Sequence, residues 1–343
     1  MKLAVVLFNL GGPDSLEAVE PFLRNLFGDP AILAVPGFVR WPLARFIASR
    51  RAPFARAIYA KLGGASPILP ETQVQADALD KVLAARGIEA KAFIAMRYWR
   101  PFARDVAARV AAWRPDRIVL LPLYPQFSTT TTGSSFEDWD RAAAKGGLKA
   151  PTSRIGCYFR AAGFIGAEAE LIRRVLVKAK PDVSYRLLLS AHGLPKRTIA
   201  KGDPYQWQVE QTAKAIVDAL GIENLDWSVC YQSRVGPLEW IGPATDAEIR
   251  RAAADGKGVI IAPIAFVSEH SETLVELDIE YAHLAASIGI VDYLRVPTVG
   301  SHPDFIAALA DLVMQAADSR ATIVEAGGCP STFGTCPCRE RLR

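Results

Sequence analysis

One histidine stands where a catalytic base could work. The stretch LLLSAHGLP, residues 187–195, passes from aliphatic residues directly into His192 and a Gly-Leu-Pro turn. A neutral imidazole near physiological pH can accept a proton or bind a metal ion. The alternative is a hydrogen-bonded core histidine without a chemical role. The end of a predicted buried strand favours the functional interpretation, because open parallel sheets bind ligands outside the carboxyl ends of their strands.

A second stretch, SEHSETLVELDIEY (268–281), carries five carboxylates and one histidine without a Lys or Arg. Glu272, Glu276 and Glu280 are spaced i, i+4, i+8, which predicts one face of an α-helix. Like charges at this spacing destabilise a helix by roughly 0.2–0.5 kcal/mol per pair, so something should compensate. A favourable helix dipole would explain Glu269 and Glu272 but not the later glutamates.

The functional interpretation of this segment is a line of oxygen ligands for a divalent cation, or a proton relay. His270 adds an imidazole, which suits Fe, Zn or Ni as well as proton transfer. The chain has no HExxH, no GxxxxGK[ST] and no GxGxxG after a strand. Metalloprotease, P-loop and dinucleotide-binding functions therefore lose their main support.

Three of the five cysteines, Cys329, Cys336 and Cys338, lie in the last fifteen residues. This C-x6-C-x-C spacing suits a metal centre better than a secreted disulfide framework, but such centres usually take four ligands. Cys230 lies in an alternating strand, where a free cysteine is most often a small buried hydrophobe. Cys157 lies in the loop-like RIGCYFR and is the favoured fourth ligand.

These residues need a scaffold, and the sequence indicates an α/β fold. Aliphatic and β-branched runs alternate with Ala-rich segments, as in βαβ units around a parallel sheet. The clearest predicted strands span 3–10, 90–96, 117–124, 186–191, 226–232 and 258–266. They match in pairs: VVLFNLGGP resembles RLLLSAHGLP, and RIVLLPLYPQFS resembles GVIIAPIAFVSE. We expect two similar halves, each a parallel sheet flanked by helices, with a cleft between them.

Spacing predicts an insertion in the first half. Gly12 and Arg97 are 85 positions apart, whereas Gly193 and Arg234 are 41 apart, a difference of 44. The insertion contains AILAVPGFVRWPLARFIASRR (31–51), in which prolines and arginines interrupt apolar and aromatic residues. Such a segment is a candidate lip over the mouth of the cleft.

Composition limits the partners. The 343 residues include 40 Lys and Arg against 36 Asp and Glu, a net charge of +4, and no long basic run. This balance argues against nucleic acid as a partner. The N-terminus lacks a signal-peptide cleavage site, and no run of 18 apolar residues occurs. We expect a cytoplasmic protein that does not span a membrane.

A series of blocks covers nearly the whole chain: NLGGP, FIASRR, GGASPI, RYWRP, YPQFSTTTTGSS, SAHGLP, GDPY, YQSRVGP, EWIGP and PIAFVSEHSETLVELDIEY. In their order and approximate spacing, the chain resembles the ferrochelatase family. The resemblance implies two Rossmann-like halves with a porphyrin cleft between them and no nucleotide. It also implies insertion of ferrous iron into protoporphyrin IX to form protohaem, with release of two protons, as the terminal step of haem biosynthesis.

By this resemblance His192 is the catalytic histidine. Glu272 and Glu276 are the acidic residues behind it, with His270 beside them, as a proton or metal relay. Iron could be bound by His192 and Glu272. Whether His192 accepts protons or ligates iron stays open, because both roles need the neutral imidazole.

The resemblance also assigns supporting and substrate-binding residues. Ser190 and the Gly193 backbone are expected to fix the catalytic imidazole. Porphyrin contacts are assigned to Tyr59, Ser66, Arg97, Tyr98 and Trp240. The aromatic side chains offer stacking faces, and the arginine offers a partner for a propionate.

The lip could attach to a membrane, because porphyrins partition into membranes. Apolar residues punctuated by Arg40, Arg45, Arg50 and Arg51 suit peripheral contact with the inner face of a membrane. A folded core helix with solvated arginines explains much of the same pattern. A homodimer is left open.

Some ferrochelatases carry a [2Fe-2S] cluster near the C-terminus, and this tail resembles such a site. In members with an animal-type cluster one cysteine follows YPQ, but Thr129 and Thr130 stand in that block here. We therefore predict a cluster whose ligands are Cys157, Cys329, Cys336 and Cys338. Structural zinc and an unliganded tail are the alternatives.

The predicted domains are a first half at 1–152 with the lip at about 14–64, a second half at 153–302, a C-terminal helix at 303–328 that packs on the first half, and a cysteine tail at 329–343. Rival functions are a cobalt or nickel chelatase, a chelatase for coproporphyrin, and a porphyrin carrier without turnover. A carrier has no use for an acidic line that leads away from the ring.

Overall fold

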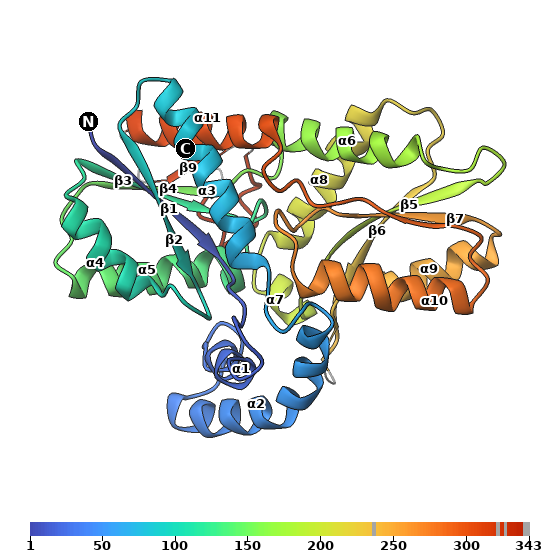
Figure 1. Ribbon diagram of the computed structural model, residues 1–343, viewed down its shortest axis with the longest axis horizontal. Helices are drawn as coiled ribbons and strands as arrows, with labels where there is room; N and C mark the ends of the chain where they lie inside the picture. Colours follow the sequence, from blue (N-terminus) through green and yellow to red (C-terminus); the bar gives the residue numbers. More distant parts are fainter. Residues whose placement is uncertain (235–237, 320–322, 326–327, 339–343) are drawn as a thin grey trace. The chain divides into compact units, whose positions relative to one another are not determined.

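The computed structural model describes residues 1–343 except 235–237, 320–322, 326–327 and 339–343. The chain divides into two compact units (Figure 1). The first covers Met1–Gly156 and 309–325, and the second covers Cys157–Ala308 and the described residues beyond 325. Parts of the predicted C-terminal segments, at 320–322, 326–327 and 339–343, lie outside the described residues.

The sheet of the first unit contains, in spatial order, β2 (Ala90–Met96), β1 (Leu3–Asn9), β3 (Arg117–Pro122), β4 (Thr152–Cys157) and β9 (Ile323–Glu325). The first four strands pair in parallel. Every residue of β1 is buried, which explains its unbroken apolar sequence, since helices cover both faces of a parallel sheet.

The helical segments of this unit are α1 (Val19–Phe27), α2 (Gly37–Ala60), α3 (Ile68–Ala85), α4 (Ala103–Trp113), η1 (Thr129–Gly133) and α5 (Ser134–Lys145). Side chains of α4 and α5 pack on alternate residues of β1, including Phe8, to form one core. The helices α1 and α2 lie within the segment predicted as an insertion, about residues 14–64, and they bury Phe22, Ala48 and Tyr59 against each other.

The sheet of the second unit contains, in spatial order, β6 (Trp227–Gln232), β5 (Tyr185–His192), β7 (Gly258–Pro263) and β8 (Tyr293–Arg295), all parallel. This order repeats that of β2, β1, β3 and β4, so the predicted similarity of the halves is confirmed. The predicted strands are all present. The short strands β8 and β9, and β4, were not predicted.

The helical segments of the second unit are α6 (Ala162–Leu176), α7 (Lys196–Ala200), α8 (Tyr205–Leu220), α9 (Thr245–Ala254), η2 (Glu272–Tyr281) and α10 (Ala282–Ser287). Helix α11 (Pro303–Asp318) begins in this unit and ends in the first. Figure 1 shows α9 and α10 on one side of the sheet and α6 on the other. Leu188, Ile261 and Leu277 lie in the core beneath α9 and α10.

Candidate active site

His192 is the last residue of β5, at the carboxyl end of its sheet, as predicted. It pairs in register with Gln232 at the end of β6. The chain passes the neighbouring strand closely at Gly193, where a Cβ atom would lie 3.0 Å from the Gln232 carbonyl oxygen and 3.3 Å from the Trp240 ring. Glycine is required by this close approach, and the motif thereby fixes where the imidazole emerges.

The imidazole of His192 is oriented by the backbone of the next residue, Gly193. Its Nδ1 lies 2.5 Å from the Gly193 carbonyl oxygen, which can only accept, so Nδ1 carries the proton. In the neutral ring Nε2 then presents its lone pair, and it lies 3.7 Å from Oε1 of Glu272. The side chain is about one-third exposed (34%).

Glu272 lies between two imidazoles. Its Oε1 faces His192 and its Oε2 lies 3.5 Å from Nε2 of His270. Burial alone would raise the pKa of Glu272, but the two histidines outweigh it and hold the pKa at about 2. The carboxylate is therefore ionised throughout the physiological range.

His270 is buried, and its Nδ1 lies 3.1 Å from the Ser268 carbonyl oxygen. As in His192, this bond assigns the Nδ1 proton and turns Nε2 toward Glu272. Burial opposes the charged form, but the Glu272 carboxylate raises the pKa of His270 overall. The Glu272 carboxylate thus faces Nε2 of two imidazoles, each of which carries its proton on Nδ1.

Glu276 is surrounded by donors. Its carboxylate accepts from the Ser233 backbone N–H at 2.8 Å, the Ser233 hydroxyl, Gln232 Nε2 at 3.1 Å and the Tyr281 hydroxyl at 3.0 Å. Burial and the nearby charge of Glu272 still raise its pKa, against the effect of Ser233. Glu276 is therefore the easier of the two carboxylates to protonate.

The acidic segment is not the α-helix that the i, i+4 spacing predicts. Residues 272–281 form a π-helix, η2, with i→i+5 hydrogen bonds, and α10 follows. Residues five apart become neighbours, so Tyr281 reaches Glu276. The prediction of one stacked helical face for Glu272, Glu276 and Glu280 was wrong in this respect.

The compensating charge expected for this segment comes from β8. Arg295 Nη1 lies 2.6 Å from Glu269, and its Nε and Nη2 each lie 2.7 Å from a different oxygen of Asp278. Burial disfavours the charged guanidinium, but these carboxylates raise the pKa of Arg295 overall. The outer carboxylates are therefore held by a permanent cation, whereas Glu272 faces histidines.

The hydroxyl of Ser190 bonds to Gln232 and Thr245. Its hydroxyl donates to Oε1 of Gln232 at 2.8 Å and lies 3.2 Å from Thr245 Oγ1. The expected orientation of His192 by Gly193 is present, but the hydroxyl of Ser190 supports Gln232 instead.

Sequence reasoning missed Gln232, Ser233 and Tyr281. Gln232 is buried and its Nε2 donates to the Glu272 carbonyl oxygen at 2.8 Å as well as to Glu276, which ties β6 to η2. The signal was available, because YQSRVGP follows a predicted strand on the binding edge. Residues 235–237 of that block lie outside the described residues.

Comparison with known proteins decides the family. The model of the family described as Ferrochelatase matches residues 2–317. The chain belongs to the ferrochelatase family. It is 54% identical over 344 residues to the ferrochelatase of Caulobacter vibrioides, covering 99% of this chain and 98% of the relative. It is 56% identical over 343 residues to that of Phenylobacterium zucineum, covering 99% of each.

The family makes this chain a metal chelatase, a lyase that inserts iron into a porphyrin for haem synthesis. Among solved structures, the sirohydrochlorin chelatase SirB from Bacillus subtilis subspecies spizizenii, in complex with cobalt, matches with a TM-score of 0.53. It is 11% identical and covers 93% of this chain and 97% of its own. This likeness supports the two-unit chelatase fold alone.

The ferrochelatase resemblance assigned four porphyrin contacts to the first unit. Among them, Arg97 Nη2 lies 2.7 Å from Asp29 Oδ2, and its Nε donates to Ser134 at 2.6 Å. Tyr98 is 1% exposed, and its hydroxyl donates to the same Asp29 oxygen at 2.8 Å. Both side chains therefore have structural partners, and substrate contact by either stays a prediction.

The other two first-unit residues lie near the insertion. Tyr59 is buried between α1 and α2. Ser66 N donates to the Pro13 carbonyl oxygen at 2.8 Å, and a Cβ on Gly12 would lie 2.5 Å from the Ser66 side chain. In the second unit Trp240 is half-buried, and its ring packs over Gly193, the residue after His192.

The four cysteines predicted as cluster ligands lie together. Cys157 contacts Cys329 and Cys338, and Cys336 contacts the same two. All four are buried, and contacts from Cys157 and Cys336 lower the pKa of Cys329 to about 3. The prediction of a loop for Cys157 was wrong, because it is the last residue of β4.

Cys230 takes no part in this group. It is fully buried in the core of the second unit beside Leu188 and Ile261. Burial raises its pKa to about 12, which keeps the thiol protonated. It is a small core residue, as the sequence indicated.

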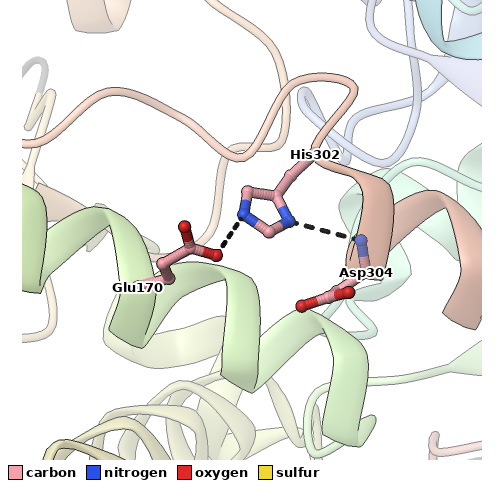
Figure 2. A group of neighbouring side chains, drawn as sticks. All are labelled: Glu170, His302 and Asp304. Atoms are coloured by element: carbon pink, nitrogen blue, oxygen red, sulfur yellow. Dashed lines mark hydrogen bonds and ion pairs between the residues drawn. The ribbon is translucent and has the colours of Figure 1, made fainter.

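A further group in the second unit, Glu170, His302 and Asp304, has the composition of a metal site, with ligand atoms within 4.8 Å of one another (Figure 2). Both nitrogens of His302 are engaged, however: Nδ1 accepts from the Asp304 backbone N–H at 3.3 Å, and Nε2 lies 2.8 Å from Glu170. A cation is also disfavoured at the N-terminus of α11. We assign these residues to anchoring α11 on α6.

Proposed function

We propose that this chain inserts ferrous iron into protoporphyrin IX with His192 as the group that receives the pyrrole protons. The observation that carries the proposal is the Gly193 bond to Nδ1, which leaves Nε2 as the basic atom beside an ionised Glu272. The product imidazolium would be stabilised by that carboxylate. Glu272 needs no reorganisation, because it is ionised before the reaction starts.

Insertion replaces two pyrrole protons by one Fe²⁺, and no electron is transferred. Two imidazoles flank Glu272, and each has an Nε2 lone pair in the neutral state. His192 would take a proton from the porphyrin and pass it through Glu272 to His270, and would then take the second. The Glu272 oxygens lie 3.7 Å from Nε2 of His192 and 3.5 Å from Nε2 of His270. Such long contacts suit a free enzyme in which these distances shorten on substrate binding.

The same geometry supports iron approach. Nε2 of His192 and an oxygen of Glu272 are the nitrogen and oxygen donors that Fe²⁺ accepts. Fe²⁺ is a substrate here, and proton acceptance and iron ligation by His192 exclude each other at any one moment. For the porphyrin, we propose Trp240 as a contact, because its ring adjoins the turn after His192.

An anaerobic assay with ferrous iron and protoporphyrin IX tests the function through loss of free porphyrin and gain of haem absorbance. We expect turnover by the wild type. His192→Ala should abolish turnover while porphyrin affinity stays within a few fold, and His283→Ala, an exposed histidine on α10, should change neither. Retention of more than about a tenth of wild-type turnover by His192→Ala would contradict its role in acid–base catalysis.

The same assay separates the rivals. A porphyrin carrier would bind protoporphyrin without forming haem. A cobalt or nickel chelatase would turn over those metals in preference to Fe²⁺, and a coproporphyrin enzyme would prefer that porphyrin. The proposal requires haem from protoporphyrin IX.

We propose further that Cys157, Cys329, Cys336 and Cys338 hold a [2Fe-2S] cluster. Each of these four buried thiols contacts two of the others, which fits a Cys₄ ligand set, and the Gln208 amide donates to Cys329 Sγ at 3.0 Å. When bound, such a cluster is a one-electron centre whose potential depends on hydrogen bonds to its sulfurs.

Absorbance of anaerobically purified protein tests this assignment. We expect a red-brown protein with a [2Fe-2S] spectrum that Cys157→Ser bleaches. The matched control is Cys230→Ser, which should keep the colour, because Cys230 lies in the core. A colourless protein with stoichiometric zinc, or a coloured Cys157→Ser variant, would refute the assignment.

We propose that α2 makes peripheral contact with a membrane. Phe38, Trp41, Phe46 and Phe54 are between 58% and 82% exposed on this helix, among its arginines. No helix in the described part of the chain is long and apolar enough to cross a membrane. Apolar side chains and arginines on one exposed helix suit an interface between headgroups and acyl chains.

Sedimentation with liposomes containing anionic lipid tests this contact. Phe38→Ser with Trp41→Ser should weaken sedimentation and raise the apparent KM for porphyrin. Val177→Ser is the control, because Val177 is as exposed (86%) but lies in the second unit. Unchanged sedimentation of the α2 variant removes the membrane part of the proposal.

A further inference from the structure

The first turn of α8 holds the backbone of the catalytic histidine. The hydroxyl of Tyr205 donates to the His192 carbonyl oxygen at 3.1 Å. Tyr205 is buried, and burial together with the charge of Glu272 raises its pKa well above the usual range, so the hydroxyl remains a donor. The bond fixes the peptide that joins His192 to Gly193, whose carbonyl oxygen in turn orients the imidazole.

The same helix face contacts the cysteine tail. Gln208 follows Tyr205 by three positions, which places the two side chains on one face of α8. Gln208 is fully buried, and its amide donates to Cys329 Sγ at 3.0 Å. One helical turn therefore joins the catalytic strand end to the cysteine group.

The tail also rests on the loop before α8. Thr335 donates to the Gly202 carbonyl oxygen through its hydroxyl at 2.9 Å and its backbone N–H at 3.4 Å. Gly202 has φ +90°, and a Cβ there would lie 3.0 Å from the Gly334 nitrogen. Only glycine fits this conformation and this approach.

Aromatic packing completes the contact. The ring of Trp207 on α8 lies 5.6 Å from that of Phe333 in the tail and 5.6 Å from that of Phe159, which follows β4. The Arg160 guanidinium lies 5.8 Å from the centre of the Trp207 ring. The start of α8 is thus enclosed by the tail on one side and by the β4 end on the other.

From these contacts we infer that the cysteine tail braces the segment 202–208, and that this segment positions His192 through the hydroxyl of Tyr205. The inference rests on the proposed function of His192. Metal insertion transfers no electron, so a cluster bound by the tail cysteines would need no redox role in this reaction. A brace accounts for the tail by contacts alone, and Tyr205 is a positioning residue.

Histidine-labelled protein tests the inference by NMR under anaerobic conditions, without substrate. The chain has four histidines, so the ring signals of His192 are assigned by their loss in His192→Gln. Tyr205→Phe and Gln208→Leu should each shift the His192 ring signals while leaving those of His283 in place. In the Tyr205→Phe background, Gln208→Leu should add no further shift, because the connection is already cut.

Two further variants test whether the shift of the His192 signals depends on the contact of the tail. Thr335→Val loosens the tail without changing a cysteine or α8, and it should shift the same His192 signals. Tyr185→Phe is the matched control, since it removes a tyrosine hydroxyl at the opposite end of β5, where Tyr185 bonds Asp292. It should leave the His192 signals unchanged.

Kinetics give the second readout. Tyr205→Phe should lower kcat about 2- to 10-fold, the net effect of one hydrogen bond, with KM for porphyrin unchanged. The inference is overturned if Gln208→Leu and Thr335→Val leave the His192 signals at their wild-type positions, or if Tyr205→Phe does so. Failure of the wild type to form haem would refute the proposed function but not the coupling, which is measured without turnover.

Discussion

Two carboxylates at opposite ends of the second sheet have the same depressed pKa for different reasons. Glu272 lies at the carboxyl end and Asp226 just before β6 at the amino end. Hydrogen bonds from Arg186, at 2.9 and 3.0 Å, and from Lys257 outweigh burial and lower the pKa of Asp226 to about 2. For Glu272, two imidazoles outweigh burial to give the same value.

The difference lies in what the partners can do. Arg and Lys keep their protons at all physiological pH values, so Asp226 belongs to a fixed ion pair. Imidazoles gain and lose protons near neutrality, so Glu272 can stabilise a proton that arrives and then leaves. A depressed pKa therefore marks a reactive carboxylate only when the groups that depress it titrate themselves.

Glu272→Gln gives the largest expected effect. Without the carboxylate, neither imidazolium is stabilised, so kcat should fall about 10²- to 10⁴-fold, the range of a lost acid–base group. The melting temperature should change little, because the variant also removes a charge that is partly withdrawn from solvent. Steady-state assays and calorimetry on the same preparations measure both. Normal turnover with an altered melting temperature would make this carboxylate structural.

Asp226→Asn should show the reverse. The buried Arg186 loses its bidentate partner, so stability should fall by about 1–3 kcal/mol while kcat stays within about twofold. Because the folded pKa of Asp226 is depressed, its stabilisation is present above the unfolded value near 3.9 and is lost as pH falls toward 2. As the pH falls from about 3.9 toward 2, the free energy of unfolding should therefore decrease less for Asp226→Asn than for the wild type. Denaturant unfolding at several pH values measures this, and an unchanged acid slope would contradict it.

The sequence predicted which end of the sheet carries the candidate site, but not the geometry of the segments around it. The buried run before His192 and the turn after it were sufficient to place this histidine at a strand end. The π-helix was not predictable, because the same residues satisfy i→i+4 and i→i+5 bonding, and tertiary contacts such as that of Gln232 with the Glu272 carbonyl oxygen decide between them. Short β8, with Arg295, carries too few residues for a periodic signal.

The cysteine group shows the same limit. The fourth ligand was inferred from freedom to move, whereas the structure brings Cys157 to the tail from a rigid strand end. The tail is held there by its contacts with Gln208 on α8 and with Gly202 in the loop before α8. Contacts between segments more than a hundred residues apart leave no local pattern in sequence.

The smallest expected effect concerns Glu276, which differs from Glu272 and Asp226 in the direction of its pKa shift. Its pKa is already raised by burial, and Tyr281→Phe removes one donor to its ionised form. The pKa of Glu276 should rise further, so the fall of kcat on the acid side should move to higher pH by less than about one unit. Activity well above that pKa should stay within about twofold. Tyr293→Phe is the matched control, because its hydroxyl donates to the Leu277 carbonyl oxygen in the same helix. If the control shifts the pH profile equally, the change reflects η2 as a whole and not the carboxylate.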